Sequence, residues 1–242
     1  MKKILFLSTF LLTCFCVFAQ TASKTEGVIS FEEKINMHRR IQNEEMKARI
    51  PEFRSSNMEL TFKGDECMYK AVEEDDEETN NGNVRMVFRR PAVEIYRNFA
   101  TNKKVEYREM MDKKYLIEGE MAQPAWKLGT ETKKIVGYDC TQATLNDTAR
   151  KQEIVAWFTM DLPLAAGPQS LGSLPGMILE LDINKGETVI TAKKIDFKSV
   201  KDNAVKAPTK GEKITEEEFK QKREEFMKRN GGGGPNFRIN RQ

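Results

Sequence analysis

The side chains that could act in catalysis are few, and they do not form a recognised set. The only histidine is His38, and no serine stands in the Gly-x-Ser-x-Gly pattern of a nucleophile elbow. A serine or cysteine nucleophile needs a nearby base, which is most often histidine. Carboxylates are plentiful, with 37 Asp and Glu residues, but no spacing singles out a pair for acid–base work on a glycosidic bond. The sequence therefore predicts a protein that is not an enzyme and has no cofactor, while it leaves a hydrolase open.

Two tryptophans and two proline–glycine segments form the candidate binding site. Trp126 and Trp157 are amphipathic aromatic residues, and Gly167-Pro168 and Leu174-Pro175-Gly176 punctuate the stretch between two expected strands. One interpretation is structural, because the second Pro-Gly pair suits the central positions of a type II turn. The other interpretation is functional: the two loops and the tryptophans form the rim of a cleft that holds a ligand. The sequence leaves both interpretations open.

The N-terminus has the pattern of a secretory signal peptide. Lys2 and Lys3 form a basic start, residues 4–18 are mostly apolar, and Val17-Phe18-Ala19 offers small residues at the positions that a signal peptidase reads. The apolar run is shorter than the roughly 20 residues that span a bilayer. We therefore predict that residues 1–19 are removed on export, and that the protein is periplasmic and not integral to the membrane.

Two cysteines, Cys67 and Cys140, remain after removal of that segment. An exported compartment is oxidising, and two remaining cysteines there favour one disulfide. The sequence thus predicts a Cys67–Cys140 bond, with two separate buried thiols as the alternative. Together with His38 these cysteines lack the paired spacing of a metal site, so no metal site is predicted.

The charge balance and the methionine content indicate which ligands and partners the protein could bind. Loss of Lys2 and Lys3 from 40 basic residues leaves 38 against 37 acidic ones. This balance provides no electrostatic attraction to nucleic acid or to an anionic membrane surface. Methionine is abundant, with 12 residues, and its thioether suits copper(I). The methionines form no Met-x-x-Met cluster and mostly fall on the apolar side of expected strands, which favours core packing over copper binding.

All of these residues depend on β-strands for their placement. In residues 58–63 and 177–183, apolar and polar residues alternate, so that one face of each strand would pack in a core. Short polar turns between such runs indicate an antiparallel sheet. So many strands must curl or split, and we expect a mainly β fold with a large curved antiparallel sheet or half-open barrel and a C-terminal helix. The other expected strands are 27–36, 84–88, 93–99, 103–109, 113–119, 125–132, 134–145, 152–160 and 189–197.

The C-terminal helix is expected over residues 215–229. Thr215 and Glu218 form a Thr-x-x-Glu capping box at its start. The four glycines after it begin a flexible Gly-rich tail over residues 231–242. A single β-rich domain is expected over residues 20–230.

Two further segments interrupt the strand pattern. Residues 37–51 are rich in helix-forming side chains and end at Pro51, so they form either a short helix or a loop. The acidic run 73–78 is expected to lie at the solvated tip of a hairpin that turns at Asn81-Gly82, rather than to bind a cation.

Residues 124–183 carry a series of short motifs in a defined order. They are Trp126-Lys127, Ile135 to Ala143 (Ile-x-Gly-Tyr-x-Cys-x-x-Ala), Ala156 to Thr159, Gly167-Pro168 and Leu174 to Gly176. This order resembles that of the GLPGLI family of exported bacterial proteins, for which no biochemical activity is established. The resemblance implies an exported domain of the same type.

The sequence as a whole predicts an exported periplasmic, non-enzymatic binding or accessory protein of the cell envelope. Its expected partner is an envelope lipid, peptide or protein. The alternative function is copper homeostasis through methionine ligands.

Overall fold

The structure is a computed structural model that describes residues 24–41, 43–72, 78–81, 84–87, 92–110, 112–148 and 150–229. The predicted signal peptide (1–19), the Gly-rich tail (231–242) and residues 73–77 of the acidic run lie outside the described residues.

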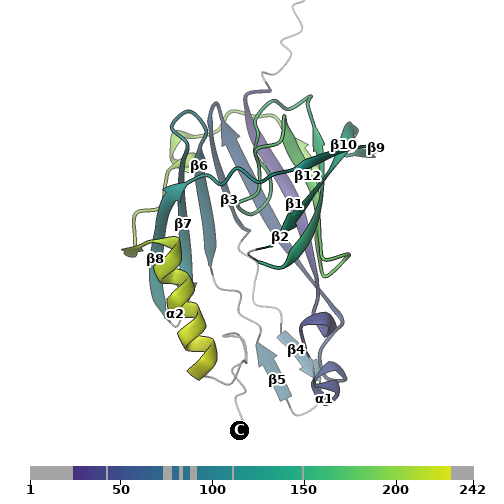
Figure 1. Cartoon of the computed structure of the whole chain (residues 1–242), viewed down its shortest axis with the longest axis vertical. Helices are drawn as coiled ribbons and strands as arrows, with labels where there is room; N and C mark the ends of the chain where they lie inside the picture. The colour runs from purple at the N-terminus through teal and green to yellow at the C-terminus, as the bar shows by residue number, and fades with distance from the viewer. Residues whose placement is uncertain are drawn as a thin grey trace, which may run out of the picture.

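Twelve strands form one curved sheet, in which every neighbouring pair is antiparallel except β14 and β8 (Figure 1). This confirms the mainly β fold with a large curved antiparallel sheet. A separate hairpin consists of β4 (Glu78–Asn81) and β5 (Val84–Val87). Across the large sheet the order is β14 (Glu212–Ile214), β8 (Lys113–Glu120), β7 (Lys103–Met110), β6 (Val93–Asn98), β3 (Glu66–Ala71), β2 (Phe53–Lys63), β1 (Glu26–Asn36), β13 (Thr188–Asp196), β12 (Met177–Ile183), β11 (Gln152–Thr159), β10 (Tyr138–Asp147) and β9 (Lys127–Ile135).

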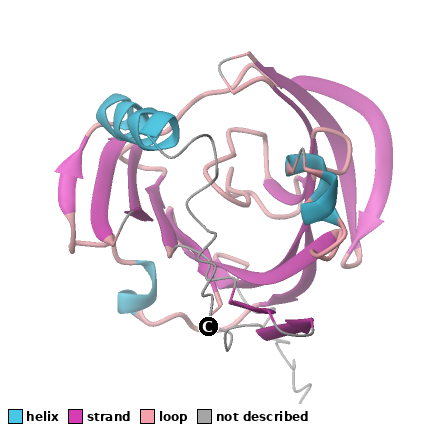
Figure 2. Cartoon of the chain, turned by 90° about the horizontal axis from the view of Figure 1, so that it is seen from below, coloured by secondary structure: helices cyan, strands magenta, loops and turns pink. Residues whose placement is uncertain are grey.

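The sheet curls, so that its strands surround an interior that loop segments occupy (Figure 2). The connection 121–126 crosses from β8, near one edge of the sheet, to β9 at the opposite edge (Figure 1). So short a connection can join opposite edges of the sheet only if the sheet curls and brings these edges toward each other, as in a half-open barrel.

The inner face of the sheet carries the main apolar core. Ile29, Leu60, Tyr69 and Ile95 are register partners on adjacent strands, and each is at most 2% exposed. Side chains of β10 to β13 join the same cluster. Burial of these alternating positions provides the main stabilisation of the sheet, at roughly 25 cal/mol per Å² of apolar surface.

The outer face carries a second, smaller apolar cluster of Met68, Tyr96, Val105 and Leu116. Residues 200–207, which we call the strap, run across it and include the 3-10 helix η2 (Asp202–Val205). Apolar side chains on both faces explain why β3 was not predicted. Its central residues Cys67, Met68 and Tyr69 are all buried, so the strand shows no alternation.

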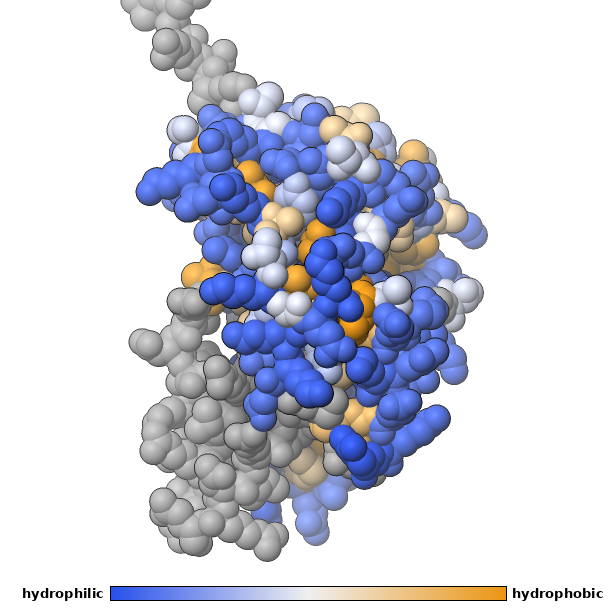
Figure 3. Space-filling model, turned by 90° about the vertical axis from the view of Figure 1, so that its left-hand side faces the viewer, coloured by the Kyte–Doolittle hydropathy of each residue, from blue (hydrophilic) through white to orange (hydrophobic). Residues whose placement is uncertain are grey.

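Three short helical segments and one longer helix complete the fold. Residues 37–51 contain η1 (His38–Arg40) and α1 (Glu44–Lys47), so both a short helix and loop are present there. The expected C-terminal helix is α2 (Glu216–Arg229), which packs Phe219 edge-to-face on Tyr115 of β8. The surface seen from the side of β8 and α2 is mostly hydrophilic, with small separate hydrophobic groups (Figure 3).

The capping box of α2 is present as predicted. The Thr215 hydroxyl accepts from the Glu218 amide at 3.2 Å, and the Thr215 amide donates to the Glu218 carboxylate at 2.7 Å. Phe219 is the only buried residue of this helix, so the cap contributes a large part of the local stability.

We therefore expect Thr215→Ala to lower the local stability of α2 by about 1 kcal/mol, because the Glu218 amide loses the hydroxyl that accepts its hydrogen bond. Hydrogen exchange of the α2 amides measures this as faster local opening. Thr209→Ala, in the exposed segment before β14, is the matched control and should leave α2 exchange unchanged. Equal exchange in the wild type and Thr215→Ala would show that the cap does not hold the helix.

Candidate functional site

The two proline–glycine segments lie in one loop, residues 160–176, which we call the signature loop. It joins β11 to β12. Gly167, Pro168, Leu174 and Gly176 are buried, whereas Pro175 is exposed. The loop returns to the sheet through backbone hydrogen bonds, including Ile178 N–H to the Ala166 carbonyl at 2.8 Å. Most of the predicted rim is therefore part of the protein interior.

Arg97 of β6 holds the signature loop from the inner face. Its side chain is 1% exposed and donates to the Leu171 carbonyl at 2.7 Å and to the Gly167 carbonyl at 2.5 Å. A buried cation without such partners would cost several kcal/mol. The loop carbonyls thus solvate the guanidinium, and the guanidinium in turn fixes the path of the loop.

The turn at the second Pro-Gly pair is tighter than the predicted type II turn. The Gly176 amide donates to the Leu174 carbonyl at 2.7 Å, two residues back, as in a γ-turn. Gly176 has φ of +146°, and a Cβ there would collide with the backbone of Thr159. Glycine is therefore required at this position by both its conformation and the close approach of β11.

The two tryptophans have different surroundings, and both are half-buried. Trp126 donates from Nε1 to the Gly172 carbonyl at 2.9 Å, which ties the crossing connection to the signature loop. Trp157 lies on β11 between the buried residues Ala156 and Phe158, and Lys133 Nζ stands 4.3 Å from its ring centroid. The structure brings Trp126 to the loop and gives Trp157 a cationic neighbour from β9. A ligand-binding role for these residues stays a prediction.

The predicted Cys67–Cys140 disulfide is not formed, and this is a correction. Both cysteines are free, buried thiols. Cys67 lies on β3 and Cys140 on β10, and five strands separate β3 from β10 in the sheet order. Burial raises the pKa of the Cys67 thiol and raises that of Cys140 to about 11. Neither thiol is activated for nucleophilic chemistry, because the thiolate is the reactive form.

The other side chains considered for chemistry have structural surroundings. The Nε2 atom of His38 is 2.8 Å from the Ile50 carbonyl and so helps to hold the segment between β1 and β2. Met58 and Met177 are core residues. Within the described part of the chain, no group of three His, Cys, Asp or Glu side chains is placed to hold a metal ion. No described helix is long and apolar enough to cross a membrane.

A buried ionic cluster lies on the inner face of β7, next to α2. Glu106 is 1% exposed and pairs with Lys104 at 3.1 Å and with Arg108 at 2.8 Å. Burial alone would raise the pKa of Glu106, but the charges of Arg108 and Lys104 outweigh it and hold the pKa below its ordinary value of 4.5. Lys104 also pairs with Glu216 of α2 at 3.0 Å, so the cluster links the helix to the sheet.

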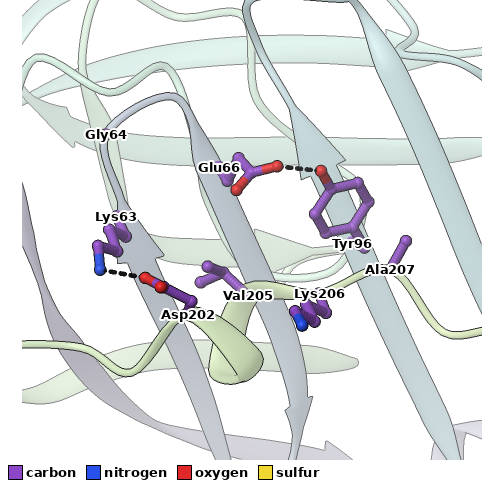
Figure 4. A pocket seen from close by; sticks show the side chains of 8 residues that line it. All are labelled: Lys63, Gly64, Glu66, Tyr96, Asp202, Val205, Lys206 and Ala207. Atoms are coloured by element: carbon purple, nitrogen blue, oxygen red, sulfur yellow. Dashed lines mark hydrogen bonds and ion pairs between the residues drawn. The ribbon is translucent and has the colours of Figure 1, made fainter.

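The outer face has a groove of about 540 Å³ where the strap passes the β2–β3 turn, and we call it the strap groove. Figure 4 shows Val205 between two polar pairs: Lys63 with Asp202, at 2.6 Å, and Tyr96 with Glu66. The volume lies in the range of small-molecule sites. The groove is lined by Lys63, Gly64, Glu66, Tyr96, Asp202, Val205, Lys206 and Ala207.

Residues 78–220 match the model of the family described as "N-glycanase peptide, N-terminal domain". This is more than half of the chain. The chain belongs to this family. No curated protein matches it.

Two solved structures resemble this member of the N-glycanase N-terminal domain family. They are titled "Structure of PNGF-II in P21 space group" and "Structure of PNGF-II in C2 space group", with TM-scores of 0.57 and 0.55 and identities of 15% and 16%. Each match covers 81% of this chain and 32% of the PNGF-II chain, so this chain spans about a third of the length of those proteins. At this identity the likeness shows a shared fold.

The N-glycanase N-terminal domain match includes some features of the candidate site and not others. It runs from β4 to the first turns of α2, and so includes Arg97, the ionic cluster and the signature loop. Lys63, Gly64 and Glu66 of the strap groove precede it. The family match thus covers the residues that build the interior around the signature loop. It does not cover the wall of the strap groove that β2, β3 and the turn between them form.

Arg97 and Glu106 were not identified from the sequence. Arg97 lies two residues after Ile95, a core residue, and so on the same face of the strand. A charged residue on a core face was the signal in the sequence that could have identified it. On β7 the apolar side chain of Val105 points to the outer cluster, whereas the charged side chain of Glu106, the next residue, points to the inner face. Alternation alone identifies two faces of a strand but does not say which face is inside.

We expect Arg97→Met to lower the free energy of unfolding by about 3 kcal/mol, because two buried carbonyls lose a charged donor. Arg97→Lys should recover only part of the loss, since one ammonium cannot reproduce the guanidinium fork. Urea unfolding measures both. Arg223→Met, on the exposed face of α2, is the control. An unchanged unfolding midpoint in Arg97→Met would contradict the clamp.

We expect Glu106→Gln to cost roughly 3 kcal/mol near neutral pH, because it leaves two cations without their buried partner. The folded-state pKa of Glu106 is depressed, so its stabilising contribution is present above the unfolded-state pKa and is lost as pH falls through the folded-state value. Unfolding curves of wild type and Glu106→Gln should therefore converge between about pH 5 and pH 2. Glu118→Gln, whose carboxylate is on the surface of β8, should show a much smaller difference. A pH-independent gap would contradict the assignment.

Proposed function

We propose that this chain is an exported, non-catalytic binding or accessory module of the cell envelope, and that it holds its ligand in the strap groove. The observation that carries the proposal is the groove itself. It is open to solvent on the outer face, it has the volume of a small-molecule site, and both of its walls present polar side chains around an apolar centre.

The state of the candidate catalytic groups supports a non-catalytic role. Both cysteine thiols are buried with raised pKa values. The single histidine has its Nε2 atom engaged at the Ile50 carbonyl. None of these three residues lines the strap groove. Cysteine- or histidine-based catalysis in the groove is therefore not supported, and its two carboxylates, Glu66 and Asp202, already pair with Tyr96 and Lys63.

The family match supports an accessory role. Its description refers to the N-terminal domain of an N-glycanase, and this chain corresponds to about a third of the PNGF-II chains. A domain that stands apart from a catalytic unit can serve by holding material for it. We propose such a holding role for the present chain, with an envelope lipid, peptide or protein as the partner.

Export and the periplasmic location belong to the same proposal. They rest on the basic and apolar pattern of residues 1–19 and on the motif order that resembles the GLPGLI family. N-terminal sequencing of the protein from the envelope fraction should find a chain that begins at Gln20. A retained N-terminus would contradict export by this route.

The binding role is tested by nuclear magnetic resonance on the isotope-labelled full chain with an envelope extract. We expect the extract to shift the amide signals of residues 63–66 and 202–207, the two segments that contain most of the residues lining the strap groove. Ala207→Trp fills the groove and should abolish the shifts, whereas Ala48→Trp, on the exposed end of α1, should keep them. Shifts that are absent, or that persist in Ala207→Trp, would contradict a ligand in this groove.

A further inference from the structure

Some polar groups of the strap groove already have hydrogen-bond partners within the protein, and others do not. The Tyr96 hydroxyl and the Asn98 side-chain amide, the latter at 3.0 Å, both donate to Oε1 of Glu66. Within the described part of the chain, no donor lies on Oε2 of the same carboxylate. A half-buried carboxylate oxygen without a donor is ready to accept a hydrogen bond from a ligand.

The opposite side of the groove supplies a donor. Lys206 is exposed and forms no ion pair with any described residue, whereas Lys63 donates to Asp202 and to the Val200 carbonyl at 3.0 Å. The Lys206 ammonium therefore remains available to a ligand, while Lys63 holds the strap in place. An acceptor and a donor thus face one groove from different elements.

The charges of the groove favour a neutral ligand. Two carboxylates, Glu66 and Asp202, and two ammonium groups, Lys63 and Lys206, line it. The balance leaves no net field to attract an anion or a cation. Val205 and Ala207 add apolar surface between the polar groups (Figure 4).

We infer that the strap groove binds a neutral saccharide. A sugar ring presents hydroxyls that both donate to the free oxygen of Glu66 and accept from Lys206, and its C–H surface packs on Val205 and Ala207. A neutral peptide offers fewer hydroxyls for this acceptor and donor pair. The inference rests on the proposed binding function and gives it a ligand class.

The test titrates the labelled full chain with three neutral probes, maltotriose, cellotriose and chitotriose, and with one acidic probe, trigalacturonate. We expect at least one neutral sugar to shift the amides of residues 63–66 and 202–207, and trigalacturonate to bind no better. Glu66→Ala should weaken that binding about ten-fold or more, because the ligand loses a charged acceptor. Lys206→Ala, on the exposed strap, should also weaken it without affecting folding.

Glu131→Ala, on the exposed edge strand β9, is the matched control and should keep the wild-type dissociation constant. The inference is overturned if no neutral sugar shifts the groove amides, or if both Glu66→Ala and Lys206→Ala keep wild-type binding. If the sugars fail while an envelope extract still shifts the groove amides, the ligand class is wrong and the binding function stands. If neither shifts them, both proposals fail.

Discussion

The buried guanidinium of Arg97 sets a constraint that the rest of the inner face must meet. A cation in an apolar core needs hydrogen-bond acceptors, and here they are the carbonyls of Leu171 and Gly167 in the signature loop. The loop can supply them only if it folds into the curve of the sheet. Its glycines and its bond to Trp126 follow from that position, because the backbone must approach β11 and the crossing connection closely. The proline–glycine segments are thereby explained as structure.

The sheet carries an apolar cluster on each face, and the two clusters are covered differently. The inner face holds the apolar core and, at β7, the ionic cluster that α2 contacts through Glu216. The outer face holds a smaller apolar cluster under the strap. The strap is narrow, so it leaves the strap groove open beside the β2–β3 turn. The candidate binding site is therefore a consequence of how the second face is covered, and it lies on the opposite face from the signature loop.

The sequence was informative about local structure and less so about placement. Alternation in residues 58–63 and 177–183 and the capping box at Thr215 predicted β2, β12 and α2, because these signals are local. The strand β3 was missed because burial on both faces removes alternation. The prediction of a disulfide was wrong. It rested on the exported compartment and the number of cysteines, and neither says how far apart the sheet places the two strands that carry them.

The candidate site shows the same limit. Sequence motifs pointed to the proline–glycine segments, whose order along the chain is distinctive, and these segments prove to be mostly interior. Arg97 and Glu66 were missed because their importance depends on partners that are distant in the sequence. For Arg97 the one local signal was a charged residue at a position on the core-facing side of its strand. For Glu66 no local signal exists, because the groove forms only when the strap crosses β3 and β6.

The central claim is that the signature loop is an interior element held by a buried charge. Native-state hydrogen exchange of the Ser173 and Ile178 amides tests it most directly, since these amides donate to the Ala165 and Ala166 carbonyls at 3.1 and 2.8 Å. We predict that both exchange only through global unfolding, with the same dependence on denaturant as the core strands. Exchange of either amide through a local opening, as fast as that of the amide of the exposed residue Lys210, would contradict the account.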